Sequence, residues 1–342
     1  MFCRTIVRGL FAAAFVASVV TATASTIPMA TVRVGNAGNA GDTNTGLGAV
    51  GYNYNIGTYD VTLTQYTAFL NSVAATDTYG LYNTSMGTDQ NVAGISRMGS
   101  SGSYSYAVIG DGQRPVTYVS WYDAVRFVNW LGTGNTESGA YTITGGSNNG
   151  GTVTVPTAAQ RAAWAAAASG IYWYLPNENE WYKAAYYDPT IAGSNKYWLY
   201  PTRNNNPPSN VLSPSGTNNA NFFDPTNGYT VTHSTTYSSS QNYLTDVGAF
   251  SSSPGPYGTF DQGGNVSQWD DTIINSTRGF RGGSWGVLSN YIASSLRDSA
   301  DSSGEGSGIG FRVASVPEPG SLALMLAVAV GLLAFDWRRT RA

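Results

Sequence analysis

Two segments of the chain repeat apolar residues with the period of an α-helix, and each begins with a capping sequence. Thr62-Leu63-Thr64-Gln65 is a capping box, and the apolar positions behind it share one helix face: Tyr66, Phe69, Leu70 and Val73. Ser120 and Asp123 form the equivalent pair before the second segment, whose apolar face carries Ala124, Val128 and Leu131. Both segments are therefore predicted to be helices.

Shorter patterns of alternation, turn residues and caps predict the other elements. They are, in chain order, a loose lead-in over residues 25–50 followed by an edge strand, strands over 54–61 and 114–119, a hairpin over 141–155, an alanine-rich helix up to Ala168, and a helix from Asn177 to just before Pro189.

Turn-forming residues dominate two long stretches, 77–113 and 190–260, which is unusual for connections in a compact domain. The chain has 41 glycines, but also 23 tyrosines and 9 tryptophans, and only 11% of its residues are charged. This aromatic content is too high for a disordered chain, so we expect a loop-rich domain with an aromatic core. Residues 190–260 would need a fixed scaffold, packed aromatic side chains or a bound ion.

Residues 1–24 have the pattern of a secretory signal peptide. Arg4 and Arg8 precede an apolar run from Leu10 to Val20, and Ala22-Thr23-Ala24 matches a small-x-small cleavage site. The only cysteine of the chain, Cys3, lies within this segment. The mature protein is therefore predicted to have no thiol, which excludes disulfides, thiolate nucleophiles and cysteine metal ligands.

Residues 316–342 combine three features of a sorting signal. Val316-Pro317-Glu318-Pro319 precedes an apolar stretch from Leu322 to Phe335, and the basic end contains Arg338, Arg339 and Arg341. This order resembles the PEP-CTERM signal, which implies processing by an exosortase-type sorting machinery in bacteria that export polysaccharide. An ordinary membrane anchor is the alternative, because trailing arginines also fit the cytoplasmic end of a span.

The charge of the remaining chain argues against a nucleic-acid partner. Between Ser25 and Pro317 there are 12 Lys and Arg against 18 Asp and Glu, a net charge of −6. No basic stripe alternates with aromatic residues, as nucleic-acid-binding surfaces require. We therefore expect no nucleic acid to bind.

Five separated blocks follow one another in an order that is typical of one family. They are YNIGTYDVTLTQYTAFLN, RPVTYVSWYDAVRFVNWL, WYLPNENEWYKAAYYDP, PYGTFDQGGNVSQWDD and RGFRGGSWGVLSNYIASSLRDSADSSGEGSGIGFRVAS. Together they resemble the sulfatase-modifying factor family, whose founding activity is that of the formylglycine-generating enzyme. The resemblance implies one domain over residues 51–315 with an α+β, C-type-lectin-like fold and little regular secondary structure.

The same resemblance implies that the oxidase chemistry of the family is lost. Its two copper-binding cysteines fall on Val287 and Ile292, while the serine and tyrosine of the site are kept as Ser284 and Tyr291, and an aromatic position is replaced by Ser267. Copper(I) is selected by soft sulfur ligands, and thiol exchange needs a thiolate. We therefore expect no copper and regard these five positions as a vestigial site.

Calcium is the cofactor that the resemblance still allows. Family ligands at this spacing correspond to Asp261, Gly264, Val266 and Gln268, and a second site would use Asn221 with the Phe222 carbonyl. Hard cations favour such oxygen ligands, but Gln268 replaces a glutamate and removes one negative charge. A hydrogen-bonded loop without metal is the alternative for both sites.

Other catalytic patterns are explained more simply. Gly282-Gly283-Ser284-Trp285-Gly286 satisfies G-x-S-x-G, but the only histidine, His233, precedes it, so we expect a structural turn in which Ser284 bonds the backbone. Further acidic residues could form a hydrolytic pair: Glu178, Glu180, Asp298, Asp301 and Glu305. Helix capping and pairing with arginines are the expected roles of these carboxylates, and the arginines are Arg281, Arg297 and Arg312.

The combined prediction is an exported, envelope-associated protein of the cell surface or exopolysaccharide matrix. Its partners would be extracellular polysaccharide or a surface protein, and its role noncatalytic binding or structure. The leading alternative is an enzyme of the same family with cysteine-independent chemistry. A lectin with a calcium-bound sugar site is a third alternative, but the acidic and amide cluster that it needs is not evident.

Overall fold

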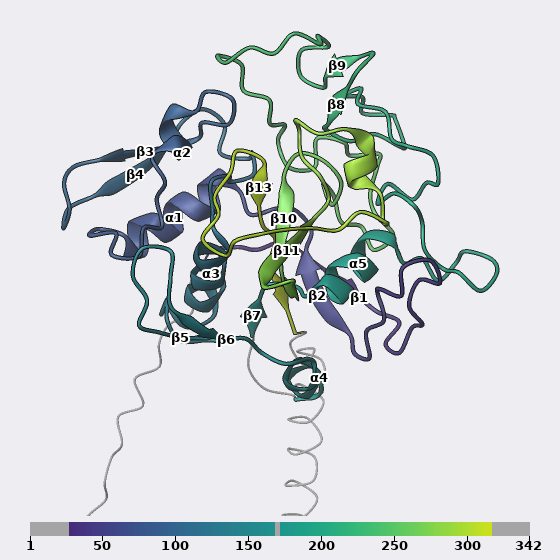
Figure 1. The fold of residues 1–342 in the computed structure, drawn as a ribbon, viewed down its shortest axis with the longest axis horizontal. Helices are drawn as coiled ribbons and strands as arrows, with labels where there is room; N and C mark the ends of the chain where they lie inside the picture. Colours follow the sequence, from purple (N-terminus) through teal and green to yellow (C-terminus); the bar gives the residue numbers. More distant parts are fainter. Residues whose placement is uncertain (1–26, 168–171, 317–342) are drawn as a thin grey trace, which may run out of the picture.

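The computed structural model describes residues 27–167 and 172–316, which form two small sheets, three hairpins and several short helices (Figure 1). The helices are α1 (Leu63–Val73), α2 (Ser85–Thr88), α3 (Trp121–Thr133), α4 (Ala158–Ala166), α5 (Glu178–Tyr186) and the 3-10 helix η1 (Ser289–Ile292). The strands are β1 (Thr31–Val34), β2 (Tyr54–Gly57), β3 (Ile95–Met98), β4 (Ser105–Val108), β5 (Thr142–Thr144), β6 (Thr152–Thr154), β7 (Trp173–Tyr174), β8 (Phe223–Asp224), β9 (Gly228–Tyr229), β10 (Ser267–Ile274), β11 (Thr277–Arg281), β12 (Asp298–Ala300), β13 (Ile309–Gly310) and β14 (Ala314–Ser315).

The first sheet joins distant parts of the chain, whereas the second is built from strands within residues 267–310. The first has the order β1-β2-β14-β7, so the last described strand pairs with β2, near the N-terminus, and with β7, near the middle of the chain. The second has the order β12-β11-β10-β13, in which β10 and β13 are parallel and the other neighbours antiparallel.

Four helices, α1, α3, α4 and α5, begin with a complete capping box. In each box the N-cap side chain and the side chain three residues later accept two backbone N–H groups that the helix itself leaves unpaired. The N-cap residues are Thr62, Ser120, Thr157 and Asn177. The predicted helices are therefore confirmed. The 141–155 hairpin is confirmed as β5 and β6, and β1 lies at the edge of its sheet.

The strand predicted over 114–119 is wrong. Only Pro115 makes a bridge there, to Thr62, and Tyr118 adopts a left-handed φ of 57° that breaks extended pairing just before α3. The strand predicted over 54–61 is shorter, since β2 ends at Gly57. The 77–113 stretch contains α2 and the β3–β4 hairpin, which its many small polar residues concealed.

Aromatic side chains fill the core, as the composition predicts. The largest buried cluster packs around α1 and α3, where Phe69 contacts Tyr66 and Phe127 edge-to-face with ring centroids 5.4 Å apart. In the long 190–260 stretch, Tyr243 stacks on Trp285 at 4.9 Å and contacts a tilted Tyr229 at 4.4 Å. Packed aromatic rings therefore support that loop region.

Across residues 27–167 and 172–316, no helix is both long and apolar enough to cross a bilayer. The predicted signal peptide, and the predicted sorting signal beyond Val316, lie outside the described residues.

Candidate functional site

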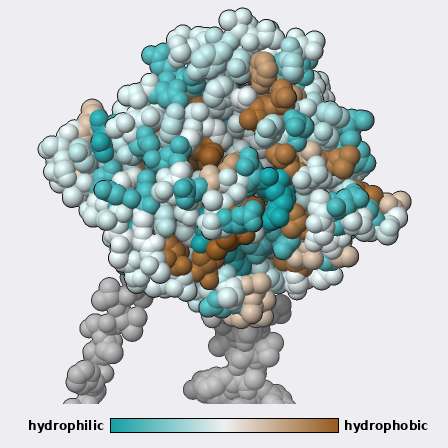
Figure 2. All heavy atoms as spheres, viewed as in Figure 1, coloured by the Kyte–Doolittle hydropathy of each residue, from teal (hydrophilic) through white to brown (hydrophobic). Residues whose placement is uncertain are grey.

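A pocket of about 210 Å³ opens at one end of the second sheet. Its walls come from the start of β10, the end of β11, the turn after β11, η1, and the starts of β12 and β13. The lining residues are Ser267, Phe280, Arg281, Gly282, Gly283, Ser284, Val287, Tyr291, Leu296, Asp298, Gly308 and Ile309. In the space-filling view, hydrophilic side chains gather near the centre of the face that carries β10, with hydrophobic ones around them (Figure 2).

Two glycines make the turn that forms one wall. Gly282 and Gly283 have φ values of 102° and 68°, which side-chain-bearing residues rarely adopt. A Cβ on Gly283 would lie 3.2 Å from the backbone of Tyr291, so the bare glycine lets η1 approach the turn. The pair thereby places Ser284 and Tyr291 on the same pocket.

The two serine hydroxyls of this pocket are free. Ser267 and Ser284 are 7% and 8% exposed, and neither hydroxyl hydrogen-bonds to any residue that the structure describes. Tyr291 stands at the rim with 38% of its surface exposed. The prediction that Ser284 bonds the backbone through its side chain is therefore wrong, because the glycine turn directs its hydroxyl to the pocket instead. Unpaired, nearly buried hydroxyls are available to a ligand.

The structure brings together four of the five vestigial positions and separates the fifth. Ser267, Ser284, Val287 and Tyr291 line the pocket. Ile292 is fully buried in a different cluster with Phe222 and other apolar residues, and its carbonyl accepts a hydrogen bond from the Tyr186 hydroxyl at 2.9 Å. Hydrocarbon side chains therefore occupy both positions that correspond to the family's cysteines.

Asp298 lines the pocket, although the sequence predicts only helix capping or ion pairing for its carboxylate. It was expected to pair with Arg297, but Arg297 donates two hydrogen bonds to Glu178, at 2.7 and 2.5 Å. The Asp298 side chain lines the pocket instead, and among the described residues its Oδ1 accepts only the neighbouring Ser299 N–H, at 2.8 Å. Adjacent side chains of an extended segment point to opposite faces, which explains the separation.

Glu178 anchors the wall behind the pocket. Its carboxylate is buried and paired with Arg281 and Arg297, and Arg281 also donates to the carbonyl of Leu296 at 2.6 Å. Nearby, burial and, to a smaller extent, the charge of Glu178 raise the pKa of the Asp270 carboxyl to about 7. As expected, Arg281 and Arg297 are partners of one of the candidate carboxylates, Glu178, whereas Arg312 pairs with Asp60, which is not among them.

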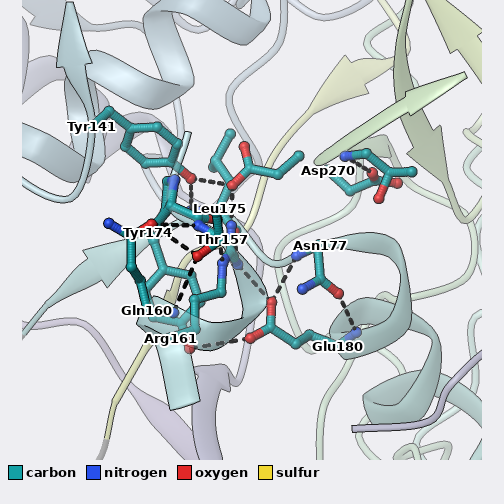
Figure 3. A network of polar contacts seen from close by, with 12 residues as sticks. Tyr141, Thr157, Gln160, Arg161, Tyr174, Leu175, Asn177, Glu180 and Asp270 are labelled. Atoms are coloured by element: carbon teal, nitrogen blue, oxygen red, sulfur yellow. Dashed lines mark hydrogen bonds and ion pairs between the residues drawn. The ribbon is translucent and has the colours of Figure 1, made fainter. Parts of the chain in front are cut away.

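Glu180 belongs to a second buried network (Figure 3). Arg161 donates to Glu180 at 2.6 Å and also pairs with Asp271, which accepts a hydrogen bond from the Tyr141 hydroxyl. Glu180 in addition completes the cap of α5 by accepting the Asn177 N–H at 2.8 Å. Both glutamates of the α5 start therefore have structural partners, and both are buried, whereas hydrolysis would require carboxylates open to a substrate.

The residues expected to bind calcium lie in the loop before β10 and at its start. Burial raises the pKa of the Asp261 carboxyl to about 6, and its Oδ2 accepts the Gly248 N–H at 2.6 Å. The Gln268 amide is fully buried and hydrogen-bonded on both sides, with its nitrogen 2.7 Å from the Asp261 carbonyl oxygen. Gln268 therefore does not fit a calcium ion in this arrangement.

The second expected calcium site is also held by hydrogen bonds. The Asn221 amide nitrogen donates to the carbonyl of Tyr243 at 2.9 Å and to Asn265 at 3.0 Å. The Phe222 carbonyl accepts from Asn210 at 3.3 Å and Thr230 at 3.2 Å. A cation there would compete with both donors for the carbonyl.

His233 lies in the exposed turn after β9 and makes no hydrogen bond to Ser284. Ser284 itself follows a strand and precedes a short 3-10 helix, not the long helix of a nucleophile elbow. The G-x-S-x-G match therefore lacks both the base and the local geometry.

The family model of the sulfatase-modifying factor enzyme 1-like domain matches residues 21–316 of the chain. The chain belongs to that family. The loop-rich α+β fold expected for the formylglycine-generating-enzyme family is thereby confirmed. No curated protein matches the chain.

Several solved structures are similar to this family member over most of their length. A structure of CarF has 19% identity and a TM-score of 0.47, covering 85% of this chain and 99% of its own. The variable protein 1 of Treponema denticola has 19% identity and a TM-score of 0.45, covering 86% and 98%. PvdO from Pseudomonas aeruginosa has 15% identity and a TM-score of 0.43, covering 85% and 93%.

Proposed function

We propose that this member of the sulfatase-modifying factor family is an exported, noncatalytic binding protein that uses the 210 Å³ pocket to hold its ligand. One observation carries the proposal: the pocket keeps two free, nearly buried hydroxyls, while hydrocarbon side chains take the places of the redox cysteines. The pocket can form hydrogen bonds, but its lining residues contain no sulfur atom that could bind copper(I) or exchange with a thiol.

The oxidase chemistry of the family would need sulfur at this pocket. Copper(I) requires soft ligands, and a mixed disulfide requires a thiolate. Val287 and Ile292 supply neither, and the one cysteine, Cys3, lies within the predicted signal peptide. The family's founding reaction therefore has no residue in the mature chain to carry it.

The lining favours a neutral, hydroxylated ligand. Ser267 and Ser284 offer hydroxyls, Asp298 offers an acceptor that disfavours anions, and Phe280 and Ile309 add apolar surface. A sugar ring has both hydroxyls and an apolar face. The pocket is smaller than the roughly 300–1,000 Å³ of sites for drug-sized molecules, so a single ring fits better than a chain.

The predicted location of the protein supports the same ligand. A signal peptide and a PEP-CTERM-type sorting signal would deliver the domain to the envelope of a polysaccharide-exporting cell through an exosortase-type machinery. We propose that the partner is extracellular polysaccharide at the cell surface or in the surrounding matrix, with a surface protein as the other candidate.

Binding of the purified mature protein to the exopolysaccharide of its host tests the proposal. Ser284→Ala should weaken binding about threefold to tenfold, because one hydrogen bond is lost, and Ser284→Trp should abolish it by filling the pocket. Ser100→Ala, in the exposed turn between β3 and β4, is the matched control and should bind like the wild type. Equal binding by all four proteins would refute the pocket as the site.

A second assay separates this proposal from the enzymatic alternative. The mature protein, incubated with a cysteine peptide derived from a sulfatase, copper and oxygen, should yield no aldehyde. A clear formylglycine product that is lost in Ser284→Trp would show that the pocket retains cysteine-independent catalysis.

A further inference from the structure

Gln268 occupies the position at which the family has a glutamate ligand, and its surroundings fix the orientation of its amide. The Oε1 atom accepts two hydrogen bonds, from Trp181 Nε1 at 2.6 Å and from Arg312 Nε at 2.8 Å. Neither indole nor guanidinium nitrogen can accept a hydrogen bond, so the amide oxygen must face them. Gln268 and Arg312 are completely buried, and no water is needed to satisfy these groups.

This orientation turns the amide nitrogen toward the loop that would surround a cation. Nε2 donates to the Asp261 carbonyl at 2.7 Å. Calcium is bound by six to eight oxygen atoms. The amide N–H groups of Gln268 carry partial positive charge, so they would repel a calcium ion in this loop and cannot act as ligands. A flip of the amide would place its N–H groups against two other donors, so the opposite orientation is unfavourable.

We infer that Gln268 replaces a calcium ion: its amide hydrogen bond closes the Asp261–Gln268 loop that a cation would otherwise hold. A glutamate at this position would keep one oxygen for Trp181 and Arg312 and present the other to the loop. In Gln268 the second oxygen is replaced by the amide nitrogen Nε2, which donates a hydrogen bond directly to the Asp261 carbonyl. The exchange of one atom converts a metal-held loop into a metal-free one.

The closed loop positions the pocket. Gly264 N–H donates to the Gly282 carbonyl at 2.8 Å, and Trp285 N–H donates to the Asn265 carbonyl at 3.0 Å. These two hydrogen bonds connect the loop to both ends of the turn that carries Ser284. Gln268 is therefore a positioning residue, and this role does not depend on the identity of the ligand.

The reverse substitution, Gln268→Glu, tests the inference by thermal unfolding of the mature protein. In a chelator, the introduced carboxylate would face the Asp261 carbonyl with no cation between them, so the Q268E protein should melt below the wild type. Addition of calcium chloride should raise its melting temperature by at least about 3 °C, since a ligand that binds only the folded state stabilises it. The melting temperature of the wild type should be the same in calcium chloride and in chelator.

Gln262→Glu is the matched control. Gln262 is a buried glutamine of the same loop, but its oxygen accepts from Thr259 at 2.6 Å and its nitrogen donates to the Trp181 carbonyl at 3.2 Å. The Q262E protein should lose stability without responding to calcium. If the Q268E protein fails to fold in chelator, recovery of soluble protein on refolding with calcium provides the same readout.

Two results would overturn the inference. A fall in the melting temperature of the wild type in chelator, restored by calcium, would show that the loop still binds the metal. No calcium response in Q268E, either in melting or in refolding, would show that the amide is not what replaced the ion.

Discussion

At the scale of single residues, buried carboxylates make the stability of this protein depend on pH. Burial raises the pKa of Asp270 to about 7 and that of Asp261 to about 6. The pKa of an aspartate in the unfolded chain is about 4. A carboxyl whose pKa is higher in the folded protein stabilises the fold while it is protonated, and this contribution is lost as the pH rises from the unfolded-state pKa through the folded-state pKa. The contribution of these two groups to stability should therefore fall between about pH 4 and pH 7.

Asp270→Asn tests this dependence. The asparagine keeps the oxygen that accepts the Thr272 N–H at 2.7 Å, but it cannot ionise. From pH 5 to pH 7.5, urea unfolding should show the wild type losing on the order of 1 kcal/mol or more relative to the variant. Asp301→Asn, at an exposed position, should follow the wild type at every pH. Parallel curves for the wild type and D270N would contradict the prediction.

At the scale of secondary-structure elements, one arginine joins three segments. Arg161 of α4 pairs with Glu180 of α5 and Asp271 of β10, and its guanidinium lies 4.5 Å from the ring centroid of Tyr174 in β7 (Figure 3). All of these groups are buried. The arginine thereby connects two short helices, α4 and α5, to the sheets.

Arg161→Met should destabilise the protein by about 3–5 kcal/mol, because two buried carboxylates lose their cation. Arg203→Met is the control: Arg203 is half exposed and lies 3.8 Å from Asp188, so its loss should cost about 0–1 kcal/mol. Chemical denaturation measures both values. A small effect in R161M would mean that hydrogen bonds to the tyrosines suffice to hold these elements together.

At the scale of the whole molecule, the proposed export would determine where the pocket acts. We predict that protein recovered from its host begins at Ser25, and that sorting removes the C-terminal segment after Val316. Intact mass spectrometry of the envelope and extracellular fractions measures both ends. A protein that keeps its arginine-rich C-terminus would support the ordinary membrane anchor, and a retained N-terminus with Cys3 would reopen thiol chemistry.

The sequence predicted those features that depend on neighbouring residues. Each capping box joins residues only three positions apart, such as Thr62 and Gln65, so the helix starts could be located directly. Identity alone showed that Val287 and Ile292 cannot bind copper. The order of the motif blocks indicated the family and its loop-rich fold.

Only the tertiary structure decided which polar groups are free and which are paired. Glu178 meets Arg281 and Arg297 across more than 100 positions, and Gln268 meets Arg312 across 44. These contacts leave Asp298 in the pocket and set the orientation of the Gln268 amide, while packing against Phe222 removes Ile292 from the pocket. The physical reason is that burial, pKa and hydrogen-bond direction depend on every group packed nearby, whatever its distance along the chain.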